Sequence, residues 1–192
     1  MNQVLRFHIL LAAALIFFGC QSKKEESATP IKKAKAILLP TEGNEVVGEV
    51  YFEEKGDGVL ITAVISKLKS GKHGFHIHEK GDCSAKDASS AGAHFNPDNE
   101  PHAGPSDKKR HVGDLGNLEA DESGVAHYKR VDNLVQLNGP KTIIGRSVIV
   151  HEKVDDFVTQ PTGDAGGRLA CGVILPFEIG RASCRERVSS PV

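Results

Sequence analysis

Histidine is concentrated in one short stretch of the chain, where residues 73–78 read HGFHIH. Histidine is the commonest metal ligand in proteins, and alternate residues of a β-strand project to the same face. A strand through this stretch would therefore present the His76 and His78 imidazoles side by side. On these six residues alone, a metal site and a solvated strand that happens to be rich in histidine are equally good interpretations.

More histidines follow in and after a long segment without periodicity, residues 80–110. His94 and His102 lie inside it. His111 follows directly, and Asp114 comes three residues later. An irregular loop of this length is unusual unless something holds it. Because three histidines and an aspartate make a complete tetrahedral ligand set for structural Zn²⁺, the segment is a candidate zinc-binding loop.

A second ligand set lies on or beside the expected strands. His151 ends the apolar run SVIV, and with His76 and His78 it would supply an all-imidazole site. Such a site suits Cu²⁺, a metal that can change its redox state. The spacing does not show which histidine belongs to both metal sites.

Short β runs separated by turn residues must position these ligands, and no helical period lasts beyond one or two turns. Even spacing of such runs predicts an all-β sandwich or barrel of about eight strands. The expected strands lie within residues 34–41, 45–54, 58–68, 73–79, 111–120, 124–131, 133–137, 145–152 and 168–175.

Composition agrees with a turn-rich β protein. Aromatic residues make up only 5% of the 192 residues, Trp is absent and there are 20 glycines, so the core must be mainly Val, Ile and Leu. The formal net charge of -1 argues against broad binding of nucleic acid.

The first 20 residues, MNQVLRFHILLAAALIFFGC, resemble an export signal. The apolar run is too short to span a bilayer comfortably and is typical of a secretory signal peptide. Gly19 followed by Cys20 resembles the lipobox of bacterial lipoproteins, in which the cysteine is acylated. Phe17 and Phe18 depart from that pattern, so a plain secretory signal is the alternative. We expect an exported protein of the periplasm or cell envelope, anchored to a membrane by lipid.

The remaining chain divides into three parts. Residues 21–36 are polar and mixed in charge, as in a flexible tether, and residues 37–177 form the domain. Residues 178–192 contain EIGRASCRERV, which matches the translation of a common sequencing adapter. We therefore expect this tail to be non-native or disordered.

The cysteines predict one disulfide. The chain has four of them, and four cysteines allow three pairings. If Cys20 carries lipid and Cys184 belongs to the tail, only Cys83 and Cys171 remain. Disulfides persist in exported proteins, so this pair is expected to be bridged.

Six motifs in order along residues 40–175 resemble copper/zinc superoxide dismutase: GFHIHE, AGAHFNP, HAGP, RHVGDLGN, GRSVIVHE and GGRLACGVI. The resemblance implies an eight-stranded antiparallel Greek-key β-sandwich or barrel with two long functional loops. It also implies an oxidoreductase that converts two superoxide anions to O₂ and hydrogen peroxide by Cu(II)/Cu(I) cycling, with a structural Zn(II). The alternative is a non-catalytic copper/zinc-binding module of the same fold.

The resemblance implies roles for individual residues. Asp155 would link His76 and His102 between the two metals, Arg168 would dock the anion, and His94 would bridge the metals and carry a proton. The copper ligands would be His76, His78, His94 and His151, and the zinc ligands would be His94, His102, His111 and Asp114.

Other expectations concern partners and the remaining histidines. His73 would tie loops together by hydrogen bonds, His127 would be solvated, and His8 belongs to the signal.

The segment between His151 and Arg168 is short and lacks a Glu-rich, Lys-containing stretch, as in exported bacterial members. The partners would be superoxide, a membrane through the lipid and a second copy in a homodimer, but not nucleic acid.

Overall fold

The computed structural model describes residues 29–177. The expected signal, Cys20, most of the tether and the tail lie outside these residues. The elements are β1 (Lys33–Pro40), β2 (Val47–Lys55), β3 (Gly58–Ser66), β4 (Gly71–His78), the 3-10 turn η1 (Ser89–Ala91), β5 (Asp114–Ala120), β6 (Ala126–Asp132), β7 (Ser147–His151), β8 (Arg168–Val173) and β9 (Leu175–Pro176).

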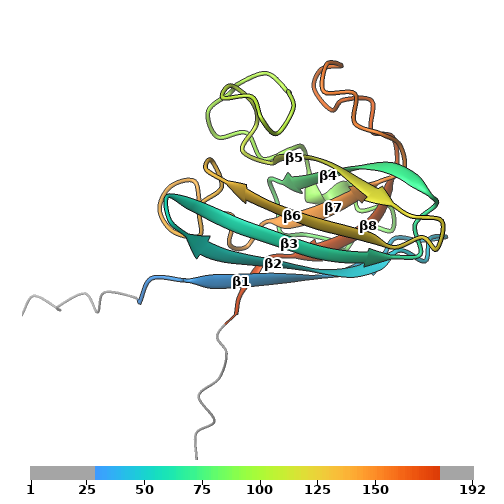
Figure 1. The fold of residues 1–192 in the computed structure, drawn as a ribbon, viewed down its shortest axis with the longest axis horizontal. Helices are drawn as coiled ribbons and strands as arrows, with labels where there is room; N and C mark the ends of the chain where they lie inside the picture. Colours follow the sequence, from blue (N-terminus) through green and yellow to red (C-terminus); the bar gives the residue numbers. More distant parts are fainter. Residues whose placement is uncertain (1–28, 178–192) are drawn as a thin grey trace, which may run out of the picture.

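Eight strands close into an antiparallel barrel (Figure 1). The order around it is β2-β3-β6-β5-β4-β7-β8-β1, and β1 pairs with β2 to complete the ring, while the short β9 pairs with β1. The expected all-β, eight-stranded antiparallel fold is confirmed. Among residues 29–177, no helix is long and apolar enough to cross a membrane.

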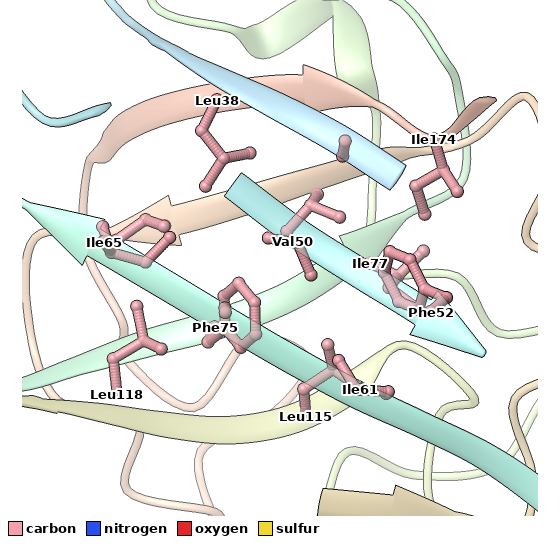
Figure 2. Packing of buried hydrophobic residues seen from close by; sticks show 14 of the residues in the cluster. Leu38, Val50, Phe52, Ile61, Ile65, Phe75, Ile77, Leu115, Leu118 and Ile174 are labelled. Carbon is pink, nitrogen blue, oxygen red and sulfur yellow. The ribbon is translucent and has the colours of Figure 1, made fainter. Parts of the chain in front are cut away.

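Alternation along β1, β2 and β3 supplies side chains to the packed core (Figure 2), whereas most of β4 and all of β7 are buried on both faces. In β3, for example, Val59, Ile61, Ala63 and Ile65 are buried and alternate with more exposed residues. Alternate residues face opposite sides of a strand, so each strand sends one row of side chains into the barrel. The largest buried side chains include Phe52, Phe75, Leu118 and Ile174.

One expected strand is absent from this part of the chain. Residues 133–137 form turns with a single bridge between Gln136 and Thr142. The Asp132 carboxylate accepts hydrogen bonds from the backbone N–H groups of Leu134 and Val135, at 2.9 and 3.2 Å. This side-chain bonding offers the backbone an alternative to a strand ladder, and that is why the apolar pattern of the segment misleads.

Two long loops extend from the same side of the barrel (Figure 1). The first, residues 79–113, joins β4 to β5, and the second, residues 152–167, joins β7 to β8. We call them the first loop and the second loop. Since β4 and β7 are hydrogen-bonded neighbours, the two loops leave the barrel from adjacent strands.

Candidate metal centre

Strands β4 and β7 hold three of the histidines. His76 and His78 lie two residues apart on β4, while Phe75 before them and Ile77 between them are fully buried in the core. His151 ends β7, which pairs with β4 through Phe75 to His78. The barrel therefore presents three imidazoles on one wall, as the alternation rule predicted for His76 and His78.

Four imidazoles form the first cluster. One ring nitrogen from each of His76, His78, His94 and His151 lies within 4.8 Å of the others, and all four side chains are buried. Nδ1 of His78 faces the Gly92 carbonyl at 2.9 Å, which leaves its Nε2 facing His151 Nε2 at 3.4 Å. The first loop brings His94 to β4 through a bridge between His78 and His94.

The second cluster has mixed ligands. Donor atoms of His94, His102, His111 and Asp114 lie within 4.8 Å of one another, and all four residues are buried. The Oδ1 atom of Asp114 lies 3.0 Å from His94 Nδ1, 3.0 Å from His102 Nδ1 and 3.2 Å from His111 Nδ1. His94 belongs to both clusters, with one ring nitrogen directed to each. The structure thus answers the question that spacing left open.

Several buried ring nitrogens have no hydrogen-bond partner among the described residues. They are His76 Nδ1, His94 Nε2, His102 Nδ1 and His111 Nδ1. An unpaired buried polar atom is costly, and native structures rarely keep several together. Cations at the two cluster centres would satisfy these nitrogens, so the donor set fits copper in the all-imidazole cluster and zinc in the cluster with Asp114.

Asp155 connects one histidine of the first cluster with one histidine of the second. Its Oδ2 lies 2.7 Å from His76 Nε2 and its Oδ1 lies 2.8 Å from His102 Nε2, with all three side chains buried. The Asn117 side chain holds the backbone of Asp155 through two hydrogen bonds of 2.8 and 2.9 Å. Such carboxylates fix the tautomer and orientation of a ligating imidazole. Each ring is therefore left with Nδ1 free to face its cluster.

Burial and charge set the protonation of the cluster. Burial, and next the neighbouring His76 ring, lower the pKa of His94 to about 4, so this imidazole is neutral near pH 7. Burial opposes ionisation of Asp114, but the close ring nitrogens of His102, His111 and His94 outweigh it and hold the Asp114 pKa well below its usual range. Burial also opposes charge on His102, whose pKa is nevertheless raised to about 9 by Asp114 and Asp155. A neutral His94 beside an ionised Asp114 is ready to bind a cation.

The family model for copper/zinc superoxide dismutase (SODC) matches residues 46–174. The chain belongs to the copper/zinc superoxide dismutase family. It is 48% identical over 147 residues to superoxide dismutase [Cu-Zn] A of Xenopus laevis, covering 73% of this chain and 96% of the relative. It is 41% identical over 176 residues to the extracellular superoxide dismutase [Cu-Zn] of Caenorhabditis elegans, covering 88% of this chain and 78% of the relative.

A solved structure of the clock protein EA4 is also similar. Its TM-score is 0.72 and its identity 44%, with 78% of this chain and 97% of that chain covered. Membership of the superoxide dismutase family agrees with a metal centre built from two clusters of these ligand types.

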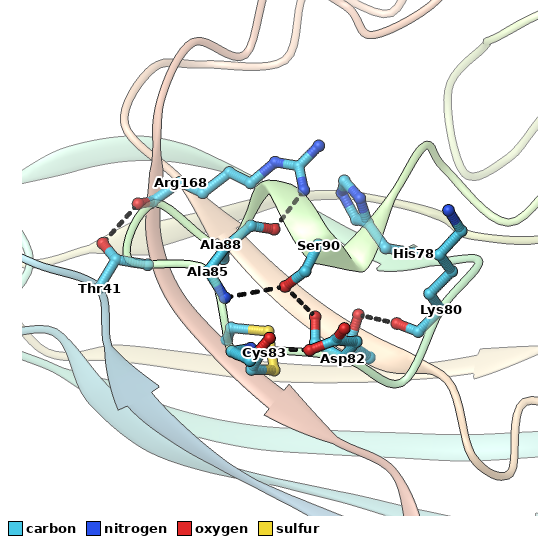
Figure 3. The surroundings of a disulfide bond; sticks show 12 residues. Thr41, His78, Lys80, Asp82, Cys83, Ala85, Ala88, Ser90 and Arg168 are labelled. Carbon is cyan, nitrogen blue, oxygen red and sulfur yellow. Dashed lines mark hydrogen bonds between the residues drawn. A yellow bond between two sulfur atoms is a disulfide. The ribbon is translucent and has the colours of Figure 1, made fainter.

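The disulfide of this family member lies beside its candidate anion-binding residue (Figure 3). Cys83 and Cys171 are bridged, with their Cα atoms 5.8 Å apart. The half-buried Arg168 donates from Nη1 to the Ala88 carbonyl at 2.6 Å and from Nη2 to the Gly92 carbonyl at 2.7 Å. Both carbonyls belong to the first loop, which the disulfide ties to β8. Arg168 is thus held by the segment that also carries His94.

The histidines outside the clusters have the expected surroundings where the structure describes them. His73 is buried, with Nδ1 facing the His151 carbonyl at 2.9 Å and Nε2 facing the Lys69 carbonyl at 2.8 Å, so it joins two segments. His127 is exposed.

Sequence reasoning missed Asn117 and Gln160, which act on the site through backbone hydrogen bonds. An amide side chain bonded to the backbone leaves no spacing signal in the sequence.

Proposed function

We propose that this chain is a superoxide dismutase, which converts two superoxide anions and two protons to O₂ and hydrogen peroxide. The observation that carries the proposal is the sharing of His94 between an all-imidazole cluster and a His₃Asp cluster, with Arg168 alongside. The proposed copper ligands are His76, His78, His94 and His151, and the proposed zinc ligands are His94, His102, His111 and Asp114. Copper would supply one-electron redox chemistry, and zinc would supply a fixed charge.

The residues of the chain would bind the substrate and handle the proton. Superoxide is a small monoanion, and the guanidinium of Arg168 is permanently charged and has fixed donors to orient it. The Nε2 atom of His94 lacks a partner in the described structure and would hold or release a proton at the substrate side. Asp114, at 3.0 Å from His94 Nδ1, would keep that ring in place as the proton moves.

A direct test uses purified protein that lacks residues 1–20. We expect copper and zinc in equal amounts and rapid removal of superoxide. Bound copper without activity would instead favour a metal-binding module of the same fold, and absence of both metals would contradict the family function itself.

Arg168 offers a sharper prediction about catalysis. Replacing it with alanine removes the charge that attracts the anion, so we expect the rate constant for superoxide removal to fall about 10–100-fold. Arg168→Lys keeps the charge and should retain part of the rate and most of its dependence on ionic strength. Pulse radiolysis over a range of salt concentrations measures both quantities. An unchanged rate in Arg168→Ala would remove Arg168 from the mechanism.

We further propose export, membrane anchoring through lipid on Cys20, and a homodimer. Residues 1–20 would be the signal, 21–36 the tether, 37–177 the domain and 178–192 a tail outside it. The similar C. elegans protein is an extracellular superoxide dismutase, which supports export. Fractionation of cells producing the natural chain and a Cys20→Ala variant tests the anchor, because the variant should leave the membrane fraction. Sedimentation velocity of the soluble domain tests the dimer.

A further inference from the structure

Gln160, an exposed residue of the second loop, pairs with the backbone of His102 in the first loop. Its Oε1 accepts a hydrogen bond from the His102 N–H at 2.8 Å, and its Nε2 donates one to the His102 carbonyl at 2.8 Å. The backbone N–H and the backbone carbonyl of His102 are thus both bonded to the side-chain amide of Gln160. This double contact fixes the position and the orientation of the His102 backbone. The side chain of His102 is a proposed zinc ligand, so this pairing constrains the backbone that carries a ligand.

Phe157 makes a second connection between the loops. It has a left-handed backbone with φ of 64°, which is unusual for a bulky aromatic residue. Its N–H donates to Asp155 Oδ1 at 2.8 Å, the oxygen that also bonds His102. Strained backbone persists only where neighbouring structure holds it. The contacts of the Phe157 ring show what holds it here.

The ring of Phe157 lies against two glycines. A Cβ atom added to Gly104 in the first loop would be 3.5 Å from Cγ of the ring, and one added to Gly116 in β5 would be 3.7 Å from Cε1. Because glycine lacks a side chain, the aromatic face can lie against the backbone of the first loop only two residues beyond His102. Phe157 nevertheless remains 38% exposed, so it is a surface contact and not part of the barrel core.

We infer that Phe157 and Gln160 form a clasp, by which the second loop positions His102 and retains zinc. The inference rests on the proposed function, because it places zinc at His102. Neither residue touches the proposed ligand atoms, so both are positioning residues. Asp155 and Asp114 lie against the two nitrogens of the His102 ring, whereas the clasp holds its backbone and the adjoining chain. Loss of the clasp should therefore loosen the zinc site while the barrel stays intact.

The test measures zinc release from the metal-loaded protein to a chromophoric chelator. In Gln160→Ala we expect zinc release to be about tenfold faster than in the unmodified protein. Loss of a residue that supports a metal ligand typically lowers metal affinity by about 10–100-fold, and we expect an effect at the lower end of that range. Gln160→Glu keeps an acceptor for the His102 N–H but sets an oxygen against the His102 carbonyl, so it should also release zinc faster. Phe157→Ala should behave similarly, while Phe157→Tyr keeps the ring and should restore slow release.

Val158→Ala is the matched control, because Val158 is in the same loop and 74% exposed. Co²⁺ in the zinc site gives a second readout, since its visible absorption reports ligand geometry: the spectrum should change in Gln160→Ala and not in Val158→Ala. Equal zinc release and equal Co²⁺ spectra in these two variants would overturn the clasp alone. If the unmodified protein bound no zinc, the clasp and the proposed function would both be overturned.

Discussion

Replacing His94 with alanine should remove both metals from their sites and lower superoxide removal at least about a hundredfold. His94 is the one residue common to the two four-residue clusters found in the described chain, so its loss leaves each with three ligands. A structural zinc site normally needs four ligands. The imidazole also provides the Nε2 atom that we propose holds the proton.

The same substitution should change the order of the first loop. In the unmodified protein, zinc binding should protect residues 79–113 from proteolysis, because ligands from this segment and β5 are drawn to one ion. His94→Ala should lose this zinc-dependent protection. The exposed His127 is the matched control, and His127→Ala should keep metals, activity and protection. Protection by zinc that is unchanged in His94→Ala would contradict the bridging role.

Removing the disulfide should have the largest effect on stability. Cys83 and Cys171 are 88 residues apart, and in the chain-entropy model a closed loop of that size stabilises the folded state by about 4–5 kcal/mol. We expect the free energy of unfolding of metal-free protein to fall by that amount when both cysteines are replaced by serine. Urea unfolding, with the intact disulfide as reference, measures the difference.

A second consequence separates this prediction from a general loss of stability. The disulfide ties the first loop to β8, and Arg168 begins β8 and bonds two carbonyls of that loop. The doubly substituted protein should therefore lose activity under conditions where it remains folded. Ser90→Ala is a control inside the same loop, since it breaks only local hydrogen bonds to Asp82 and Ala85. Full activity in the folded protein without its disulfide would show that Arg168 does not depend on it.

Much of the fold and of the site follows from local pattern. Alternation along strands predicted the barrel, and it placed His76 and His78 on one face because side chains repeat every two residues. The number and type of ligands indicated two metals. The strand predicted over residues 133–137 was wrong, because the Asp132 carboxylate accepts hydrogen bonds from the backbone of this segment and holds it in turns.

Other features have no local signal. The sharing of His94 depends on how the first loop folds back onto β4, which no spacing rule contains. The contact of Gln160 with His102 joins residues 58 positions apart through backbone groups, so residue type does not reveal the partner. Family resemblance supplied the ligand sets, but it did not include Gln160 or Phe157.

Closure of the barrel has a consequence for the order of events during synthesis. Leu39 in β1 pairs with Cys171 in β8, so the first and last strands of the ring meet only after more than a hundred intervening residues have emerged. Pairings between such distant segments form slowly. His151 and Arg168 also emerge late. A chain that must cross a membrane before folding would benefit from this delay, because it cannot close and capture its metals until its far end has arrived.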